Sequence, residues 1–231
     1  MTVLTILYDN HAMESLCPGW GFSAYIQTEG AVVLFDAGAD RLVLENNARQ
    51  LGCNLDIVTA LVLSHDHCDH TGGVSAVLHE GLHLYVPSAF AKRFEGSADT
   101  GIEVTGVKKP VEIVPGVRSI GQFGRKIPEQ AILADGSESL VLITGCAHEG
   151  IVKIARQATE MAEQPLAFLI GGFHLFRKNA TEIHHTADEL RKLGIQRIAP
   201  CHCTGSSAIE ALQQAFGEGF VKIQAGSQID L

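Results

Sequence analysis

Long hydrophobic runs are absent from this chain of 231 residues. The apolar stretches 60–63 and 167–170 fall far short of the roughly 20 residues that a membrane-spanning helix needs. The N-terminus enters a strand-like pattern at once, without the basic region, apolar run and cleavage site of a secretory signal. We therefore expect a cytoplasmic protein with no membrane partner.

Positive charge is also scarce. The chain has 17 Lys and Arg against 26 Asp and Glu, which gives a net charge of −9. This balance disfavours nonspecific attraction to nucleic acid or to anionic lipid. A small molecule is the substrate we expect, and a nucleic acid is not an expected partner.

Cysteine is too sparse for a disulfide scaffold, because only six occur in the whole chain. Four of them lie within two residues of a histidine: Cys68, Cys146, Cys201 and Cys203. Reduced thiols near a functional site fit this placement better than disulfides do. We expect Cys68 and Cys146 to pack or to support the site, and we keep a soft metal-ligand role open for Cys201 and Cys203.

Linkers, repeats and low-complexity tracts are missing as well. Hydrophobic residues make up 46% of the chain, and no Pro/Ser-rich stretch or block of like charge divides it. The chain is therefore expected to be globular, with one domain over residues 1–231.

Short β-rich runs alternate with helical patterns along the chain. Strands are expected near 2–8, 22–28, 31–36, 59–64, 83–87, 111–114, 131–135, 139–144, 166–170 and 196–199. Helices are expected between Asp40 and Gly52, over a second stretch that buries 151, 154, 158 and 161, and between Asn179 and Gly194. Two sheets with outer helices fit this order best, in an α/β (α+β) class.

Histidine is concentrated at one point, directly after the apolar run 60–63. The segment Ser64-His-Asp-His-Cys-Asp-His70 places His65, His67, Asp69 and His70 within six positions. Imidazoles with one carboxylate suit a divalent metal such as zinc, with iron or manganese as alternatives. The alternative is a solvent-exposed polar loop that is rich in histidine by chance. It does not account for so many potential ligands directly after a buried strand.

Three later histidines also follow apolar strand-like runs: His148, His174 and His202. The ends of strands are where α/β folds place functional residues. Each histidine alone could be an ordinary hydrogen-bonded residue, but together with the first cluster they predict one shared metal site.

The order His65-x-His67-x-Asp69-His70, then His148 and His202, resembles the metallo-β-lactamase superfamily. More narrowly, the chain resembles the branch of metal-dependent hydrolases that includes 7,8-dihydropterin-6-methyl-4-(β-D-ribofuranosyl)aminobenzene 5′-phosphate synthases. The motifs that carry this second resemblance are Asp9-Asn10, 35–38, 128–131, 144–148, 171–175 and 202–205. The resemblance implies a four-layer αββα sandwich with the metal site at the open edge between its sheets.

The resemblance also implies the ligand sets of a binuclear site. His65, His67 and His148 would bind a first metal, and Asp69, His70 and His202 a second, with a water or hydroxide between the ions. Asp36 would orient ligands by hydrogen bonding, although an aspartate that merely forms the turn before Gly38 is an equal alternative. One or two zinc ions are the expected cofactor.

The chain departs from the family pattern in two places. No acidic residue lies between positions 163 and 182, and Gly171 and Gly172 stand where the family usually has a bridging aspartate. His174 then either fills this gap as a ligand or faces the substrate as a donor or acid; we favour the second role. Gly19 and Trp20 also differ from the branch's usual residues, which points to a different substrate.

These features predict a metallohydrolase in which a metal-bound hydroxide attacks a small ester, lactone or phosphorylated substrate, with the pterin-related synthase reaction as a variant. Asp69 and His174 are the expected catalytic residues, Asp69 because it can also relay a proton. Two alternatives stay open: a non-catalytic metal-binding or sensory domain, and an iron-dependent redox enzyme.

Overall fold

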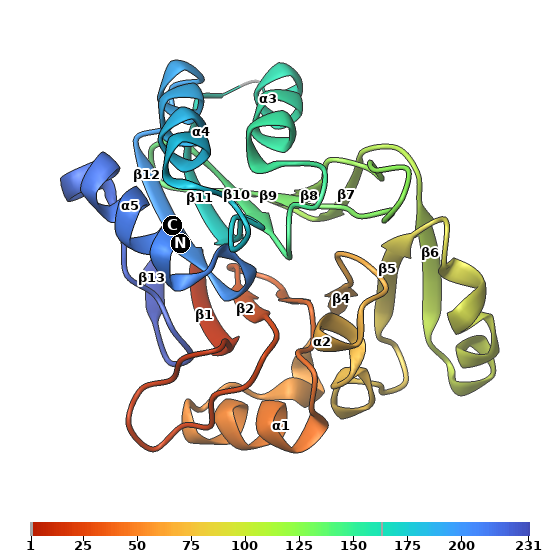
Figure 1. The fold of residues 1–231 in the computed structure, drawn as a ribbon. Helices are drawn as coiled ribbons and strands as arrows, with labels where there is room; N and C mark the ends of the chain where they lie inside the picture. Colours follow the sequence, from red (N-terminus) through yellow and green to blue (C-terminus); the bar gives the residue numbers. More distant parts are fainter. Residues whose placement is uncertain (1, 163) are drawn as a thin grey trace.

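Two mixed β-sheets pack face to face in the computed structural model, which describes residues 2–162 and 164–231 (Figure 1). Helices cover the outer face of each sheet, so the layers follow the order helix, sheet, sheet, helix. This αββα arrangement confirms the fold predicted from the sequence.

The first sheet contains seven strands. Their order is β13 (Gln228–Asp230), β1 (Val3–Tyr8), β2 (Ser23–Gln27), β3 (Val32–Phe35), β4 (Ala60–Val62), β5 (His83–Pro87) and β6 (Glu103–Val107). Strands β3 to β6 run parallel to one another. The segments that follow β3 and β4 therefore emerge at the same edge of the sheet.

The second sheet contains six strands. Their order is β12 (Arg197–Cys201), β11 (Leu166–Gly172), β10 (Leu140–Thr144), β9 (Ile132–Asp135), β8 (Val117–Ser119) and β7 (Val111–Val114). Strands β10, β11 and β12 are parallel, so the three histidine motifs that follow them leave the sheet side by side.

The predicted helices form where their caps and apolar spacing indicated. Helix α1 (Arg41–Gln50) begins at Asp40, whose carboxylate accepts hydrogen bonds from two backbone amides of the first turn. Helix α4 (Ala180–Lys192) begins with a capping box between Asn179 and Glu182. The remaining α-helices are α2 (Cys68–Thr71), α3 (Ile151–Met161) and α5 (Ser206–Phe216).

Three apolar layers hold the sandwich together. The central layer lies between the sheets and includes Ile26, Phe35, Ile143 and Ile170. A second layer joins the second sheet to α3, α4 and α5, and a third joins the first sheet to α1. Each amphipathic element thus buries its apolar face, which is the main source of stability for such a fold.

Several elements were not expected from the sequence. These are helix α5, strands β6, β8 and β13, and five 3₁₀ segments at Leu55–Ile57, Val74–Ala76, Ala91–Thr100, His202–Thr204 and Gly217–Gly219. Helix α5 carries a usable signal, because Ala208, Leu212 and Phe216 recur at every fourth position and are all buried. The three-residue strands β8 and β13 offer no such pattern.

Among the helices of the described residues, none is long and apolar enough to cross a bilayer.

Candidate metal centre

The predicted site residues meet at one edge of the sandwich, where the parallel strands of both sheets end. Asp36 follows β3 and His65 follows β4 in the first sheet. His148, His174 and His202 follow β10, β11 and β12 in the second. The structure therefore brings together the predicted site histidines, Asp36 and Asp69, whereas Cys201 packs in the core between the sheets.

The first predicted ligand set forms a compact group. The inward ring nitrogens of His65, His67 and His148 lie within 4.8 Å of one another. Nε2 of His65 lies 3.0 Å from Nδ1 of His67. His65 is fully buried whereas His67 is exposed, so this half of the centre opens to solvent on the His67 side.

The second predicted set is deeper in the protein. Asp69, His70 and His202 also place their potential ligand atoms within 4.8 Å of one another. Oδ2 of Asp69 lies 3.4 Å from Nε2 of His202 and 3.8 Å from Nε2 of His70. The carboxylate therefore faces both imidazoles.

The carboxylate of Asp36 connects the two groups through hydrogen bonds to Ser64 and His70. It accepts hydrogen bonds from the backbone amide of Ser64 at 2.6 Å, from the Ser64 hydroxyl at 2.7 Å and from Nδ1 of His70 at 2.6 Å. Because the Ser64 hydroxyl donates to Asp36, its oxygen accepts from Nδ1 of His65 at 2.8 Å. Both histidines thus carry the proton on Nδ1 and direct the lone pair of Nε2 inward.

The other two histidines are oriented in the same way. Oε2 of the buried Glu129 lies 3.2 Å from Nδ1 of His148. The side chain of Asn10 binds His202 twice, through Nδ1 of the ring at 3.1 Å and the backbone carbonyl at 3.0 Å. Partners of this kind fix the tautomer and direction of metal-binding imidazoles. Neither Glu129 nor Asn10 was predicted as a site residue, although both lie in motifs that carry the family resemblance.

Backbone strain is concentrated at this centre. Asp36, Ala147, His174 and His202 all have positive φ, between 48° and 61°. This left-handed region is uncommon for residues with a side chain and costs on the order of 1–3 kcal/mol each. The Asp36 turn therefore combines both predicted roles: it is a strained turn, and its carboxylate orients His70.

The electrostatics favour neutral ligands in the first group. Burial, together with the neighbouring imidazoles, holds the pKa of His65 well below its usual value. Burial and His148 also lower the pKa of His67. Protons therefore compete weakly for these nitrogens at neutral pH.

In the second group the electrostatics favour the charged forms of His70 and Asp69. Burial alone lowers the pKa of His70, but the carboxylate of Asp36 outweighs burial and the net shift is upward. Burial likewise raises the pKa of Asp69, but the facing imidazoles of His202 and His70 reverse this and the net shift is downward. Asp69 is therefore ionised and carries negative charge into the centre.

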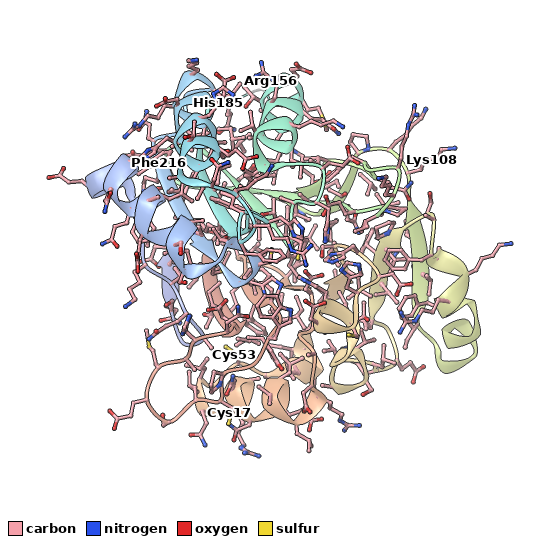
Figure 2. The ribbon with its side chains drawn as sticks, in the orientation of Figure 1. Cys17, Cys53, Lys108, Arg156, His185 and Phe216 are labelled. Carbon is pink, nitrogen blue, oxygen red and sulfur yellow. The ribbon has the colours of Figure 1, made fainter. Side chains whose placement is uncertain are left out.

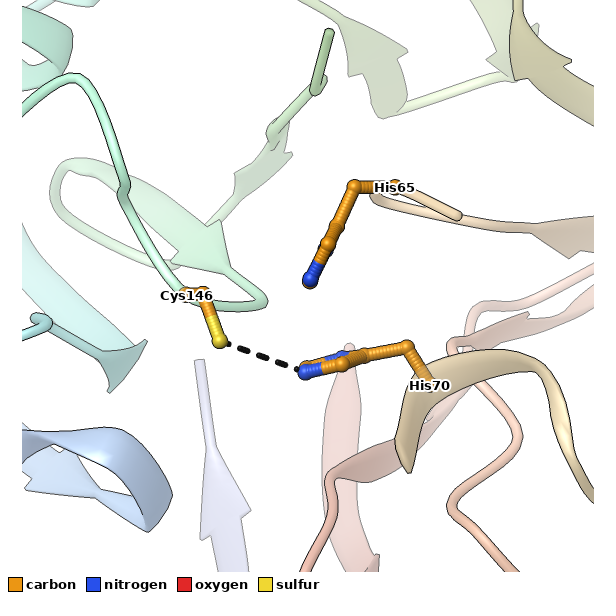
Figure 3. Close-up of side chains that lie close together, drawn as sticks. All are labelled: His65, His70 and Cys146. Carbon is orange, nitrogen blue, oxygen red and sulfur yellow. Dashed lines mark hydrogen bonds between the residues drawn. The ribbon is translucent and has the colours of Figure 1, made fainter. Parts of the chain in front are cut away.

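Two cysteines approach the same space. The thiol of Cys146 lies 3.3 Å from Nε2 of His70 (Figure 3), and Cys203 packs beside it with its sulfur 3.5 Å from the Cys146 carbonyl oxygen. Cys17 and Cys53 lie apart from this space, near α1 (Figure 2). All six are free thiols, as expected.

His174 lies beside the first group. Its ring centroid is 4.6 Å from that of His148 and 5.2 Å from that of Phe176. The neighbouring thiol of Cys203 raises the pKa of His174, which burial opposes. His174 is therefore placed to hold a proton at the rim of the centre.

The donor set fits a divalent metal. Nε2 of His202 is buried and makes no hydrogen bond, although an unpaired buried nitrogen carries a free-energy penalty of about 1–3 kcal/mol. A cation among neutral imidazoles, a carboxylate and thiols would satisfy it, and these donors suit zinc or iron. The centre is thus a histidine-rich candidate metal site.

Comparison with known proteins agrees with this arrangement. The family model described as the metallo-beta-lactamase superfamily matches residues 19–129. The solved structure of Tm1679, described as a metal-dependent hydrolase of the beta-lactamase superfamily, has the same fold. It aligns with a TM-score of 0.83 and 24% identity over 100% of this chain and 99% of that one.

Residues 19–129 thus match the metallo-beta-lactamase superfamily, and the chain as a whole has the fold of that superfamily. Two relatives from Methanocaldococcus jannaschii cover nearly the whole length of this chain. One is a 7,8-dihydropterin-6-methyl-4-(beta-D-ribofuranosyl)-aminobenzene-5'-phosphate synthase, 24% identical over 91% of this chain and 89% of its own. The other is an uncharacterized protein, 26% identical over 92% and 94%. The predicted superfamily resemblance is therefore confirmed.

Proposed function

We propose that this protein is a metal-dependent hydrolase of small organic molecules. The observation that carries the proposal is the meeting of two groups, His65, His67 and His148 with Asp69, His70 and His202, at one partly open edge. The first group would hold one divalent metal and the second group another, with zinc as the preferred ion. Such ions lower the pKa of coordinated water to about 7 and polarise a carbonyl or phosphoryl oxygen.

The residues beside the metal groups would handle protons. Asp69 is ionised and faces the centre, so its carboxylate can orient or accept the proton of an attacking water. His174 has a raised pKa and stands at the rim, so its imidazolium can donate a proton to the leaving oxygen. These complementary states support opposite catalytic roles for the two side chains.

The surroundings of the centre support a small substrate with an apolar part. Trp20, which is 57% exposed, lies against the ring of His202 with centroids 5.0 Å apart. Phe176, 44% exposed, stands beside His174 and stacks with the guanidinium of Arg177. Two exposed aromatic rings thus lie beside histidines of the centre, and Arg177 adds a positive charge suited to an anionic substituent.

A small cavity extends from the other side of the centre. Its volume is about 240 Å³, and it is lined by His67, Asp66, Ala89, Phe90, Lys126, Ile127 and Pro128. Its apolar walls, with one lysine and one aspartate, would accept a compact apolar part of a substrate. The synthase from M. jannaschii suggests a phosphorylated pterin-related compound as one variant of this substrate class.

Hydrolysis assays would test the proposal. Zinc-loaded protein should hydrolyse at least one member of a panel of small carboxylic esters, lactones and phosphoesters, and chelation should abolish turnover. H67A should lose both retained metal and activity. H174A should keep the first metal and lose about a hundredfold or more in turnover, as expected for a general acid.

The exposed His184 of α4 provides a matched control, since H184A should retain metal and activity. Full metal loading without turnover of any panel member would contradict the hydrolase and favour a non-catalytic metal-binding domain. Abundant iron with oxygen consumption would instead favour the redox alternative.

A further inference from the structure

The thiol of Cys146 lies at the junction of the two histidine groups. Its sulfur is within 4.8 Å of the ligand nitrogens of His65, from the first group, and His70, from the second (Figure 3). It also lies within 4.8 Å of ligand atoms of His148 and His174, and of His202 and Cys203. Cys146 is only 3% exposed, so its sulfur faces the metal centre and not solvent.

Glycines allow the segment that carries Cys146 to pack closely against its neighbours. A side chain at Gly172 would collide with the carbonyl oxygen of Gly145 and with the sulfur of Cys203, 2.7 Å from the added carbon. A side chain at Gly145 would collide with the Ser64 hydroxyl and the Asp36 carboxylate. The segment after β10 therefore lies directly against the end of β11 on one side and against the residues that orient His65 and His70 on the other.

A second observation indicates that this junction receives a ligand. Nε2 of His202, which is 3% exposed, makes no hydrogen bond and belongs to a group with the sulfurs of Cys146 and Cys203. Oδ2 of Asp69 lies 3.4 Å from this nitrogen. His202 thus belongs both to a group with Asp69 and His70 and to a group with two thiols, and imidazole, carboxylate and thiol donors suit a borderline-soft cation.

We propose that Cys146 supplies a thiolate ligand to the metal centre. This inference rests on the proposed function, because it requires a metal to be bound by the histidine groups. The Sγ–H proton leaves to solvent as the metal–sulfur bond forms, since a coordinating thiol is deprotonated. Cys146 is a better candidate than Cys203, because Cys203 approaches only one of the two groups, through His202.

The thiolate also gives the centre a metal preference. Thiolate ligands select zinc or iron, whereas sites made of carboxylate, carbonyl and water favour magnesium, calcium or manganese. The centre should therefore retain zinc, and manganese should not displace it.

Cobalt substitution tests the assignment by a readout that does not depend on activity. The cobalt-loaded wild-type protein should show a near-ultraviolet thiolate-to-cobalt charge-transfer band together with its ligand-field bands. C146S should lose the charge-transfer band and bind its second equivalent of cobalt at least about tenfold more weakly. C203S and the exposed-site control C17S should keep the band.

X-ray absorption of the zinc-loaded wild type provides a test that needs no variant. A sulfur scatterer should lie at about 2.3 Å from zinc, beyond the nitrogen shell at about 2.0–2.1 Å. Two results would overturn the role of Cys146 and leave the proposed hydrolase intact. One is a zinc coordination shell without sulfur. The other is a charge-transfer band that persists in C146S and disappears in C203S. Failure of the wild type to bind zinc or cobalt would overturn both proposals.

Discussion

The carboxylate of Asp36 accepts a hydrogen bond from Nδ1 of His70 at 2.6 Å, and both side chains are completely buried. The same carboxylate holds the backbone amide and hydroxyl of Ser64, directly before His65. One buried anion thus orients a histidine in each of the two groups. Its removal should disturb both.

D36N tests this dependence with little change in shape. Asparagine tolerates the left-handed backbone at position 36, where φ is 59°. Its amide group, however, cannot accept all three hydrogen bonds, and a donor left unpaired in the core is costly. We expect a loss of about 3 kcal/mol in the free energy of unfolding, measured with urea.

The same variant should weaken zinc binding by about 10–100-fold in a chelator competition, because His70 loses the partner that fixes its ring. The exposed D188N serves as the control and should change neither quantity. Unaltered zinc affinity in folded D36N would show that Asp36 only forms the turn.

Glu129 should act on one group alone. Its carboxylate contacts Nδ1 of His148 at 3.2 Å and accepts the backbone amide of Glu149 at 3.1 Å. E129Q should therefore reduce affinity at the first metal position by about 10–100-fold and leave the second nearly unchanged. Titration with two equivalents of cobalt separates the two positions by their spectra.

The matched control for this variant is E138Q, at an exposed turn. If E129Q lost the same amount of metal affinity at both positions, the two groups would respond as one unit. That result would contradict an independent role for His148 and its partner.

The candidate ligand residues could be predicted from the sequence because they cluster in short motifs. His65, His67, Asp69 and His70 lie within six positions after a buried strand, and His148 and His202 follow parallel strands. Parallel strands deliver the segments after them to one edge, so convergence followed from the fold. The apolar pattern was enough to predict most of these strands.

The residues that orient the candidate ligands could not be predicted in the same way, because their contacts join distant parts of the chain. Asn10 contacts His202 across 192 positions, and Glu129 reaches His148 across 19. No local pattern encodes such pairs. The positive φ of Ala147 also cannot be predicted from the sequence, because alanine is not typical of a left-handed backbone.

The stability of the metal-free protein should depend on pH through His65. Its folded-state pKa is lowered, chiefly by burial, whereas an unfolded chain keeps a histidine pKa of about 6.5. Below that pH the unfolded state binds more protons, so the free energy of unfolding falls as the pH falls. Above it, His65 is neutral in both states and its contribution is constant.

Urea denaturation of chelated wild type and H65Q, at about pH 7.5 and about pH 5, measures this contribution. The stability difference between the two proteins should shift in favour of H65Q at the lower pH. H184Q, on the exposed face of α4, should follow the wild type at both values. If the free energy of unfolding changed equally with pH in the wild type and H65Q, the lowered pKa of His65 would be contradicted.

Gly172 should be intolerant of a single added methyl group, because the ends of β10 and β11 are in direct contact there. The new carbon would collide with the carbonyl oxygen of Gly145 and lie 2.7 Å from the sulfur of Cys203. Backbone cannot yield as a flexible side chain does, so we expect G172A to lose about 1–3 kcal/mol in the free energy of unfolding.

The displaced segment carries Cys146 and His148, so G172A should also bind zinc more weakly than the wild type. G30A is the matched control, since a carbon added at Gly30 meets no atom within 4 Å. That variant should be neutral or stabilised by up to about 1 kcal/mol, because alanine restricts the unfolded chain. Wild-type zinc affinity in folded G172A would show that the close approach of these strands does not position the ligands, and that the two glycines serve packing alone.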